Sequence, residues 1–295
     1  MDVEMKIQEP INRVTRKQKL KNYSKHPGSF LLALFTKLAI LLTVLALGFI
    51  LIYILVKGIP NLSTDLFALK YTTENVSMLP AIINTLIITL LSLCIAGPIG
   101  IFSAIYLVEY AKKGNKLVGV VRVTAETLTG IPSIVYGLFG MLFFVTTLKC
   151  GYSLLAGALT LSIMVLPVIM RTTEEALLAV PNSFREGSFG LGAGKLRTIF
   201  KIVLPSAVPG ILAGVILAIG RMVGETAALI YTAGTVAEIP SSIMSSGRTL
   251  AIHMYSLSKE GLYTNQAYAT AVVLLIVVVL INMLSNFVAK KFTKK

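Results

Sequence analysis

Long stretches without a single charged residue dominate the chain. Six of them lack Asp, Glu, Lys and Arg and span 19 to 34 residues: 38–56, 75–108, 127–148, 150–170, 202–220 and 261–289. A helix needs about 20 apolar residues to cross the hydrocarbon core of a bilayer, so each stretch predicts one transmembrane helix. The second is longer than one crossing requires, and its helix is expected to start near Pro80. The fifth is expected to continue past Arg221 and Glu225 to about Thr232, which places two charges inside the membrane.

The composition supports a membrane protein. Hydrophobic residues make up 55% of the chain and charged residues 14%, with a mean hydropathy of +0.82, whereas soluble domains carry about 25% charged residues. In a soluble protein the net charge of +14 would suggest binding to nucleic acid. Here the charges lie between the apolar stretches, which argues against a nucleic-acid partner. The predicted fold class is all-α, a polytopic membrane protein with six transmembrane helices.

The basic residues predict the orientation, since Lys and Arg accumulate in short cytoplasmic loops. Nineteen of them lie in the N-terminal tail, the loop after the second stretch, the segment after the fourth and the C-terminal tail, against five on the opposite side. Both termini are therefore predicted to be cytoplasmic, in a plasma or inner membrane. Residues 1–30 are expected to form a basic cytoplasmic tail, which either retains this topology or lies on anionic lipid as an amphipathic helix. Residues 31–295 are expected to form one membrane domain, with the first apolar stretch as an uncleaved anchor.

The outward loop at 233–260 contains Pro240 and a Ser-rich stretch, and it is compatible with either a short re-entrant helix or a surface helix. His253 in this loop and His26 in the tail are expected at the surface rather than as ligands. Cys94 and Cys150 lie far apart in the sequence with no His nearby, which argues against a disulfide framework and a zinc site.

The cytoplasmic segment at about 172–201 is long for a link between two helices, where roughly 2 to 8 residues is usual. It predicts short helices at 174–180, from Pro181 to Phe189 and at 195–203, with a glycine-rich break at 190–194. Asn182 or Ser183 is expected to cap the second of these helices. A projecting helical element of this kind indicates a partner protein.

This segment also carries a recognisable motif, E-(x)5-G-(x)9-I-x-L-P, formed by Glu186, Gly192, Ile202, Leu204 and Pro205. It resembles the EAA loop of binding-protein-dependent ABC importer permeases, although Gly187 and Ser188 replace the two alanines. The resemblance implies a coupling helix that docks onto a separate ATPase subunit, with Glu186 and Gly192 fixing the helix and its turn. The alternative is an ordinary amphipathic loop that stops at a glycine.

The chain is expected to hydrolyse no ATP itself. A P-loop requires G-x-x-x-x-G-K-[ST], but Gly194 and Lys195 are followed by Leu196 and preceded, five positions before Gly194, by Phe189. No Ser-His-Asp, His-Glu-x-x-His or paired-carboxylate arrangement is recognisable. The sequence therefore predicts a protein that is not an enzyme and that uses neither a cofactor nor a metal ion.

Charged residues inside or beside the apolar stretches are the candidate site. Ionisable groups within a span are costly and usually face a bundle interior or a water-filled path. Arg171 and Glu174 lie at i and i+3 at the cytoplasmic end of the fourth stretch, and Arg221 and Glu225 at i and i+4 in the fifth. An arginine fork matches a tetrahedral oxyanion, so a small anion is the expected cargo. The alternative for each pair is an ion pair that locks two helices, and this alternative is favoured for Arg122 with Glu126.

The fifth stretch also carries glycines at four-residue spacings, which are expected to let another helix approach closely: Gly210, Gly214, Gly220 and Gly224. In the third stretch, Pro132 and Gly137 are expected to kink or loosen the helix.

Three segments resemble a narrower family over about residues 75–290: GIPSIVYGLFG at 130–140, RTTE at 171–174 and RMVGETA at 221–227. They are similar to the permease of phosphate ABC importers, of the PstA type. The resemblance implies a MetI-like permease fold and four kinds of partner: a second, PstC-like permease, two PstB-like ATPase subunits, an external PstS-like phosphate-binding protein and the bilayer. It also implies that Arg171, Glu174, Arg221 and Glu225 line the phosphate path. A permease for sulfate or molybdate, an ATP-independent anion carrier and a membrane scaffold that signals phosphate status remain alternatives.

Overall fold

The computed structural model describes residues 27–112 and 114–293, and within them it contains helices, turns and loops but no strand. The predicted all-α class is confirmed. By their internal contacts the residues divide into two compact units, 1–54 and 55–295. Each unit is described by itself below.

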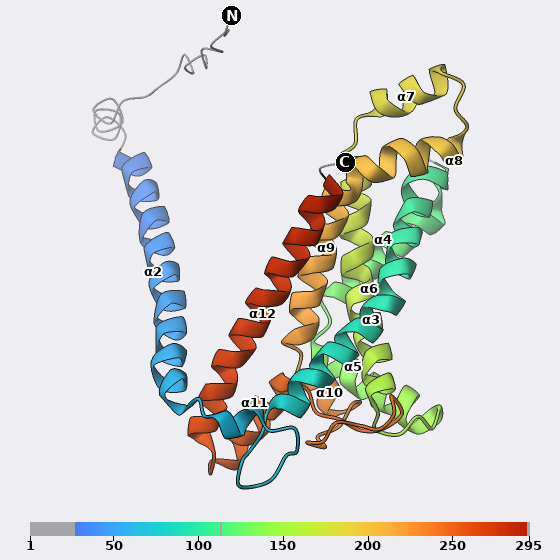
Figure 1. Ribbon diagram of the computed structural model, residues 1–295. Helices are drawn as coiled ribbons and strands as arrows, with labels where there is room; N and C mark the ends of the chain where they lie inside the picture. Colours follow the sequence, from blue (N-terminus) through green and yellow to red (C-terminus); the bar gives the residue numbers. More distant parts are fainter. Residues whose placement is uncertain (1–26, 113, 294–295) are drawn as a thin grey trace, which may run out of the picture. The chain divides into compact units, whose positions relative to one another are not determined.

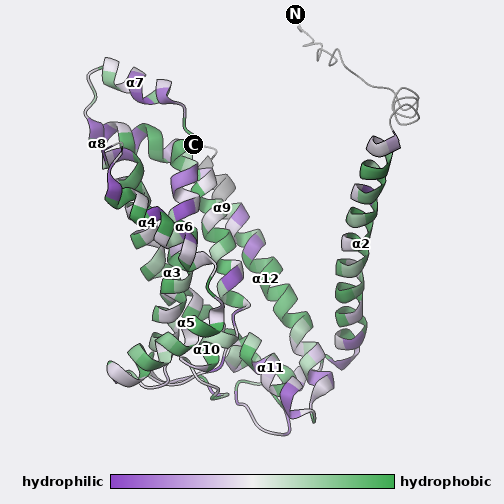
Figure 2. Cartoon of the chain, turned by 180° about the vertical axis from the view of Figure 1, so that it is seen from behind, coloured by the Kyte–Doolittle hydropathy of each residue, from purple (hydrophilic) through white to green (hydrophobic). Residues whose placement is uncertain are grey.

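The first unit contains most of helix α2, Pro27–Gly58, which includes the first predicted span. None of the residues in the most apolar window of this helix is buried, and most of α2 has the colour of hydrophobic residues in Figure 2. A helix that is apolar all round is suited to a membrane span.

The second unit is a bundle of helices (Figure 1). Two short 3-10 turns, Ile59–Asn61 and Thr64–Phe67, precede it. Its helices are α3 (Leu79–Ile105), α4 (Lys116–Thr129), α5 (Ser133–Gly140), α6 (Leu154–Leu178), α7 (Asn182–Gly190), α8 (Lys195–Thr198), α9 (Leu204–Val223), α10 (Ala227–Ile230), α11 (Leu250–Glu260) and α12 (Thr264–Thr293). Wider π-helical turns extend α3 (Tyr106–Tyr110) and α5 (Met141–Thr147) and join α8 to α9 (Ile199–Val203).

Helix α6 is the centre of this unit. In its most apolar window 67% of the residues are buried, a larger share than in any other long apolar helix of the described chain. It packs against α3, α9 and α4, and Leu161, Met164 and Ile169 on its surface are fully buried in the main core. Because α6 touches several neighbours, charges at its end lie where several helices meet.

Small residues bring α9 close to α6. A Cβ added at Gly210 would lie 2.6 Å from the Cβ of Ala176, and one at Gly214 would lie 2.5 Å from the Cβ of Thr172. The predicted close approach is therefore confirmed at these two glycines. It is wrong for Gly220, where an added Cβ would meet nothing within 4 Å.

The third predicted span is not one straight helix. Helix α4 ends at Thr129 and α5 begins at Ser133, and the two are bent by 103° across this break. Within residues 27–112 and 114–293, five helices are long and apolar enough to cross a membrane, and the bent pair makes six if it counts as one crossing. Pro132 lies in the break, because its ring cannot continue the hydrogen bonding of the preceding helix.

The fifth predicted span ends earlier than expected. Helix α9 stops at Val223, Gly224 forms its C-cap, and the short α10 begins at Ala227. The expectation of one helix to about Thr232 is wrong, and so is the placement of Arg221 and Glu225 on one helical face. Arg221 lies in the last turn of α9 and Glu225 lies beyond it.

The segment at 172–201 forms the expected helices with two corrections. Helix α6 continues through Glu174 to Leu178, so 174–180 is not a separate helix. Helix α7 begins with Pro181 as its N-cap and no side-chain cap, so neither Asn182 nor Ser183 caps it. The glycine break is real, and Gly192 has φ +80°, a left-handed conformation that glycine adopts without strain. In both views α7 and α8 lie at one end of the bundle, and α10 and α11 lie at the other (Figures 1 and 2).

Candidate functional site

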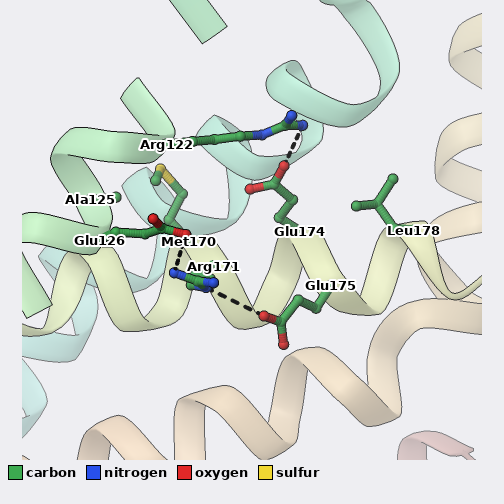
Figure 3. Close-up of a pocket in the computed structure, with 8 residues that line it drawn as sticks. All are labelled: Arg122, Ala125, Glu126, Met170, Arg171, Glu174, Glu175 and Leu178. Carbon is green, nitrogen blue, oxygen red and sulfur yellow. Dashed lines mark hydrogen bonds and ion pairs between the residues drawn. The ribbon is translucent and has the colours of Figure 1, made fainter. Parts of the chain in front are cut away.

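A cavity of about 180 Å³ lies between α4 and α6. Its lining is dominated by charge, as Figure 3 shows, with Arg122, Ala125, Glu126, Met170, Arg171, Glu174, Glu175 and Leu178 around it. Residues one turn apart on α4 face residues one turn apart on α6. The local helical spacing therefore places two cations and three carboxylates around one small space.

The ion pairs in this cavity cross from helix to helix. Arg122 Nη2 on α4 lies 2.5 Å from Glu174 Oε1 on α6, and Arg171 Nη1 on α6 lies 2.7 Å from Glu126 Oε1 on α4. Arg171 Nε also lies 3.4 Å from Glu175 Oε1 within α6. Figure 3 shows the three contacts together. The sequence suggested pairs within a helix, Arg122 with Glu126 and Arg171 with Glu174. In the structure each of these arginines instead pairs with the glutamate on the other helix.

The two crossed pairs differ in their access to solvent. The side chain of Glu174 is 10% exposed, whereas those of Arg171 and Glu126 are 47% and 55% exposed. An exposed ion pair contributes little to stability and separates easily, while a buried carboxylate depends strongly on its partner. Arg171 is therefore the cation whose partner can be exchanged at the lowest cost.

Arg221 is in a different setting. It is half-buried in the last turn of α9, and it forms no ion pair with any residue of the described ranges. The C-terminal end of a helix carries partial negative charge, which stabilises the guanidinium without a carboxylate. Tyr136 on α5 lies within electrostatic reach of it.

Glu225 forms no ion pair with Arg221. It is buried, and its Oε1 accepts a hydrogen bond of 3.1 Å from the backbone N–H of Ala228 at the start of α10. The same short helix packs against α5, where a Cβ added at Gly137 would lie 2.8 Å from the Cα of Ala228. Gly137 is therefore needed for helix contact, and the hydroxyl of Tyr136 donates a 2.8 Å hydrogen bond to Leu128 O across the bend.

Glu186 and Gly192, which were predicted to couple the chain to an ATPase, lie at the end of the bundle formed by α7 and α8. Glu186 is exposed on α7, and Gly192 is exposed in the turn that follows. Phe184, Phe189 and Leu191 are also exposed, the last at 90%. An exposed apolar patch beside a charged residue is typical of a surface that binds another protein.

Two further polar groups lie at the opposite end, where the sequence analysis expected surface residues. Arg248 is 5% exposed and lies 4.6 Å from the centre of the Tyr71 ring. His253 on α11 is fully buried, so the expected surface position is wrong. Burial and the neighbouring Arg248 lower the pKa of His253 to about 3. His26 lies outside the described residues.

No group of three or more His, Cys, Asp or Glu side chains with a metal-binding arrangement occurs in the part of the chain that the structure describes. Within the same residues Cys94 is an exposed free thiol and Cys150 a partly buried one.

Comparison with known proteins decides the family. Residues 96–295 match the family described as the binding-protein-dependent transport system inner membrane component. The chain belongs to this family. It is therefore a multi-pass permease of an ABC importer, and in such importers ATP hydrolysis takes place on separate subunits. The predicted importer permease is confirmed.

Individual relatives agree with this assignment. The permease is 36% identical over 84% of its length to the phosphate transport system permease protein PstA of Pasteurella multocida, and it covers 90% of that protein. It is 32% identical over 82% of its length to the probable ABC transporter permease protein YqgI of Bacillus subtilis, covering 88% of it. A PstA-like permease is thus the confirmed assignment.

Solved structures confirm the fold. The permease superposes on a chain of a bacterial alginate ABC transporter with a TM-score of 0.67 at 16% identity, over 92% of this chain and 98% of that one. It also superposes on a chain of the methionine ABC transporter MetNI in inward-facing conformations, with a TM-score of 0.56 at 21% identity, over 73% and 94% of the two chains. The predicted MetI-like permease fold is confirmed.

Proposed function

We propose that this permease is the PstA-like subunit of an ATP-driven importer of inorganic phosphate. The observation that carries the proposal is the similarity over most of the chain to a relative that is named as a phosphate transport permease. Its partners are a PstC-like permease, two PstB-like ATPase subunits and a PstS-like phosphate-binding protein outside the membrane. Residues 31–295 form the permease domain, 172–201 its coupling segment and 1–30 a basic cytoplasmic tail.

In this proposal the end of the bundle that carries α7 is cytoplasmic. The excess of Lys and Arg in the segments predicted to lie there supports this orientation. The described part of α12 ends at the same end of the bundle as α7, which is consistent with a cytoplasmic C-terminus (Figure 1). Helices α10 and α11 then face the binding protein.

The proposed path uses Arg221 first and the cavity at Arg171 second. Arg221 has no ion-pair partner in the described residues, so an incoming oxyanion need not displace a carboxylate from it. At Arg171 the anion replaces the exposed carboxylate of Glu126. Arg221 and Arg171 bind the anion in turn, while Glu174 and Glu225 are kept from neutralising them by Arg122 and the α10 backbone.

Carboxylates beside the arginines favour phosphate over sulfate. At neutral pH inorganic phosphate keeps at least one proton and can donate a hydrogen bond, whereas sulfate carries none. An ionised carboxylate can only accept hydrogen bonds. Glu126 and Glu175 at Arg171 can therefore accept the phosphate proton, while they repel sulfate.

On the cytoplasmic side, ATP binding by the partner subunits moves α7, and the bundle opens outward to receive phosphate from the binding protein. Hydrolysis and release reopen it inward. Glu186 on the exposed face of α7 and the turn at Gly192 form the contact with the ATPase.

The test is uptake of labelled phosphate into vesicles that contain the complete complex, with ATP supplied to the ATPase subunits. We expect ATP-dependent uptake that excess sulfate or molybdate does not inhibit and that Glu186→Lys abolishes, because the reversed charge disrupts docking. Glu74→Gln, which changes an exposed carboxylate in the loop that precedes α3, is the control and should leave uptake unchanged.

Two results would contradict the proposal. Uptake that sulfate or molybdate suppresses better than phosphate would identify another oxyanion as the cargo. Flux of phosphate through the isolated chain, driven by an ion gradient without ATPase subunits, would identify a secondary carrier.

A further inference from the structure

Arg185, which the sequence analysis did not single out, is the most extensively bonded cation in the described chain. Its Nε and Nη2 donate to Glu109 Oε1 at 3.0 and 2.7 Å. Nη2 also donates to Leu177 O at 2.9 Å, and Nη1 donates to Val180 O at 2.8 Å. The side chains of Arg185 and Glu109 are only 15% and 9% exposed.

These contacts join three parts of the molecule. Arg185 belongs to α7, and Glu109 belongs to the π-helical turn that extends α3. Leu177 lies in the last turn of α6, and Val180 follows the end of that helix. Carbonyls at a helix C-terminus lack partners within their own helix, and a guanidinium has enough donors to satisfy them and a carboxylate at once. A lysine at this position has neither the fork nor the reach to do so.

The same end of α3 is tied to the coupling segment a second time. The ammonium of Lys195 on α8 lies 4.8 Å from the centre of the Tyr110 ring. Helices α7 and α8 are joined in turn by the buried hydroxyls of Ser188 and Thr198, which are 2.8 Å apart. The two short helices therefore rest on the end of α3 as one body.

Chain connectivity shows why the ion pair matters. Helix α6 leads directly into α7, so the backbone itself carries a displacement of α7 into α6. Helix α3 is separated from α7 by 76 residues along the chain at this pair. A displacement of α7 reaches α3 directly only through side-chain contacts, of which Arg185 with Glu109 is the buried ion pair.

We propose that Arg185 and Glu109 form a positioning pair that makes α3 move with α7, so that docking of the ATPase displaces α3 and α6 together. This inference rests on the proposed role of α7 as the coupling helix. Without the pair, α7 still moves α6 but slips against α3, and ATP is hydrolysed with less transport. Arg185 and Glu109 touch neither the substrate nor ATP in this role.

The test measures phosphate taken up per ATP hydrolysed in the reconstituted complex. Glu109→Gln removes the charge and leaves the carbonyl contacts of Arg185 in place, and Arg185→Lys keeps the charge and removes the fork. We expect both variants to assemble and hydrolyse ATP, with uptake per ATP reduced about tenfold, a size typical of coupling between distant sites. The double variant should be no worse than Arg185→Lys alone, because the two residues act as one unit.

The control variants change charged residues at exposed positions away from the Arg185–Glu109 pair. Glu74→Gln changes an exposed carboxylate in the loop that precedes α3, and Lys70→Gln changes an exposed lysine in the same loop. Both should leave the ratio of uptake to hydrolysis unchanged. An unchanged ratio in Glu109→Gln would overturn the proposal. Failure of every pair variant to assemble would also overturn it, because the pair would then be needed for folding rather than for coupling.

A second readout does not depend on the cargo. Spin labels at Ser183→Cys on α7 and Lys112→Cys beyond the end of α3 would report the distance between these elements in the assembled complex, with Cys94 and Cys150 replaced by Ser. We expect one narrow distance with and without ATP, and a broader, ATP-dependent distribution in Glu109→Gln. A narrow distribution in that variant would contradict the pair's role even if the cargo is not phosphate. Conversely, if the complex takes up no phosphate but the spin-label distances are as expected, only the proposed cargo is refuted.

Discussion

Two arginines predicted on the substrate path, Arg171 and Arg221, lie in opposite electrostatic settings. Arg171 contacts two carboxylates, Glu126 at 2.7 Å and Glu175 at 3.4 Å, beside a third pair between Arg122 and Glu174. Arg221 has no ion-pair partner in the described residues and lies at a helix C-terminus instead. The carboxylates at Arg171 favour a cation, and so does the partial negative charge at the helix C-terminus near Arg221.

The difference has a consequence for an anionic cargo. An anion that reaches Arg221 gains a charge-assisted contact without breaking one, whereas at Arg171 it must displace Glu126 or Glu175. Binding at the first position is therefore favoured, and release is favoured at the second, where the carboxylates return. Two equally attractive arginines would instead hold the anion too tightly to pass it on.

The largest expected effect comes from removing the arginine without a partner. Arg221→Ala should lower the initial rate of phosphate uptake by about 100-fold, since a hydrogen bond to a charged group contributes about 1.5 to 3 kcal/mol. Arg221→Lys should retain part of the rate, because it keeps the charge but loses the fork. Uptake assays in reconstituted vesicles measure both. Normal uptake by Arg221→Ala would exclude this residue from the path.

The second-largest expected effect is a difference in stability between two variants of the charged cavity between α4 and α6. Arg122→Gln leaves Glu174 unpaired with its side chain only 10% exposed, and we expect a loss of about 2 to 4 kcal/mol of stability. Arg171→Gln leaves two carboxylates that are more than half exposed, and the loss should stay below about 1 kcal/mol. Thermal unfolding of the purified protein in detergent compares them. Equal losses would mean that the two pairs do not differ in burial as described.

The smallest effect concerns the helix contact that sets the separation of the two arginines. Gly214 on α9, the helix of Arg221, lies against Thr172, the neighbour of Arg171 on α6. Gly214→Ala should push the helices apart and cost about 1 to 3 kcal/mol. Gly220→Ala on the same helix is the matched control, because its Cβ meets nothing within 4 Å. Equal unfolding temperatures for the two variants would contradict the close contact.

Sequence patterns predicted the transmembrane helices and the short helices around the glycine break at 190–194, but only one of the two interruptions of the spans. The apolar stretches identified the spans because the requirement for about 20 apolar residues acts on the local sequence. Pro132 was expected to kink the third span, and the break between α4 and α5 at this residue confirms it. The end of α9 at Val223 was placed wrongly. The residues at 222–232 are mostly apolar or small, so their pattern is compatible with a continuous helix and does not show that α10 packs against α5.

The candidate site was predicted by its residues but not by its contacts. Helical spacing correctly brought Arg122 and Glu126 to one face of α4, and Arg171 and Glu174 to one face of α6. The exchange of partners between α4 and α6 requires the two helices to be side by side, which no local pattern specifies. Arg185 was missed for the same reason, since its carboxylate partner lies 76 residues away in the chain.

The amino-acid sequence alone determined that this protein is a helical membrane protein with a helical segment between its fourth and fifth apolar stretches, because hydropathy and charge act residue by residue along the chain. Only the tertiary structure decided which charges neutralise one another and which cation is left without a carboxylate. Electrostatic energy depends on distances of a few ångströms between side chains, and those distances are set when the helices pack together.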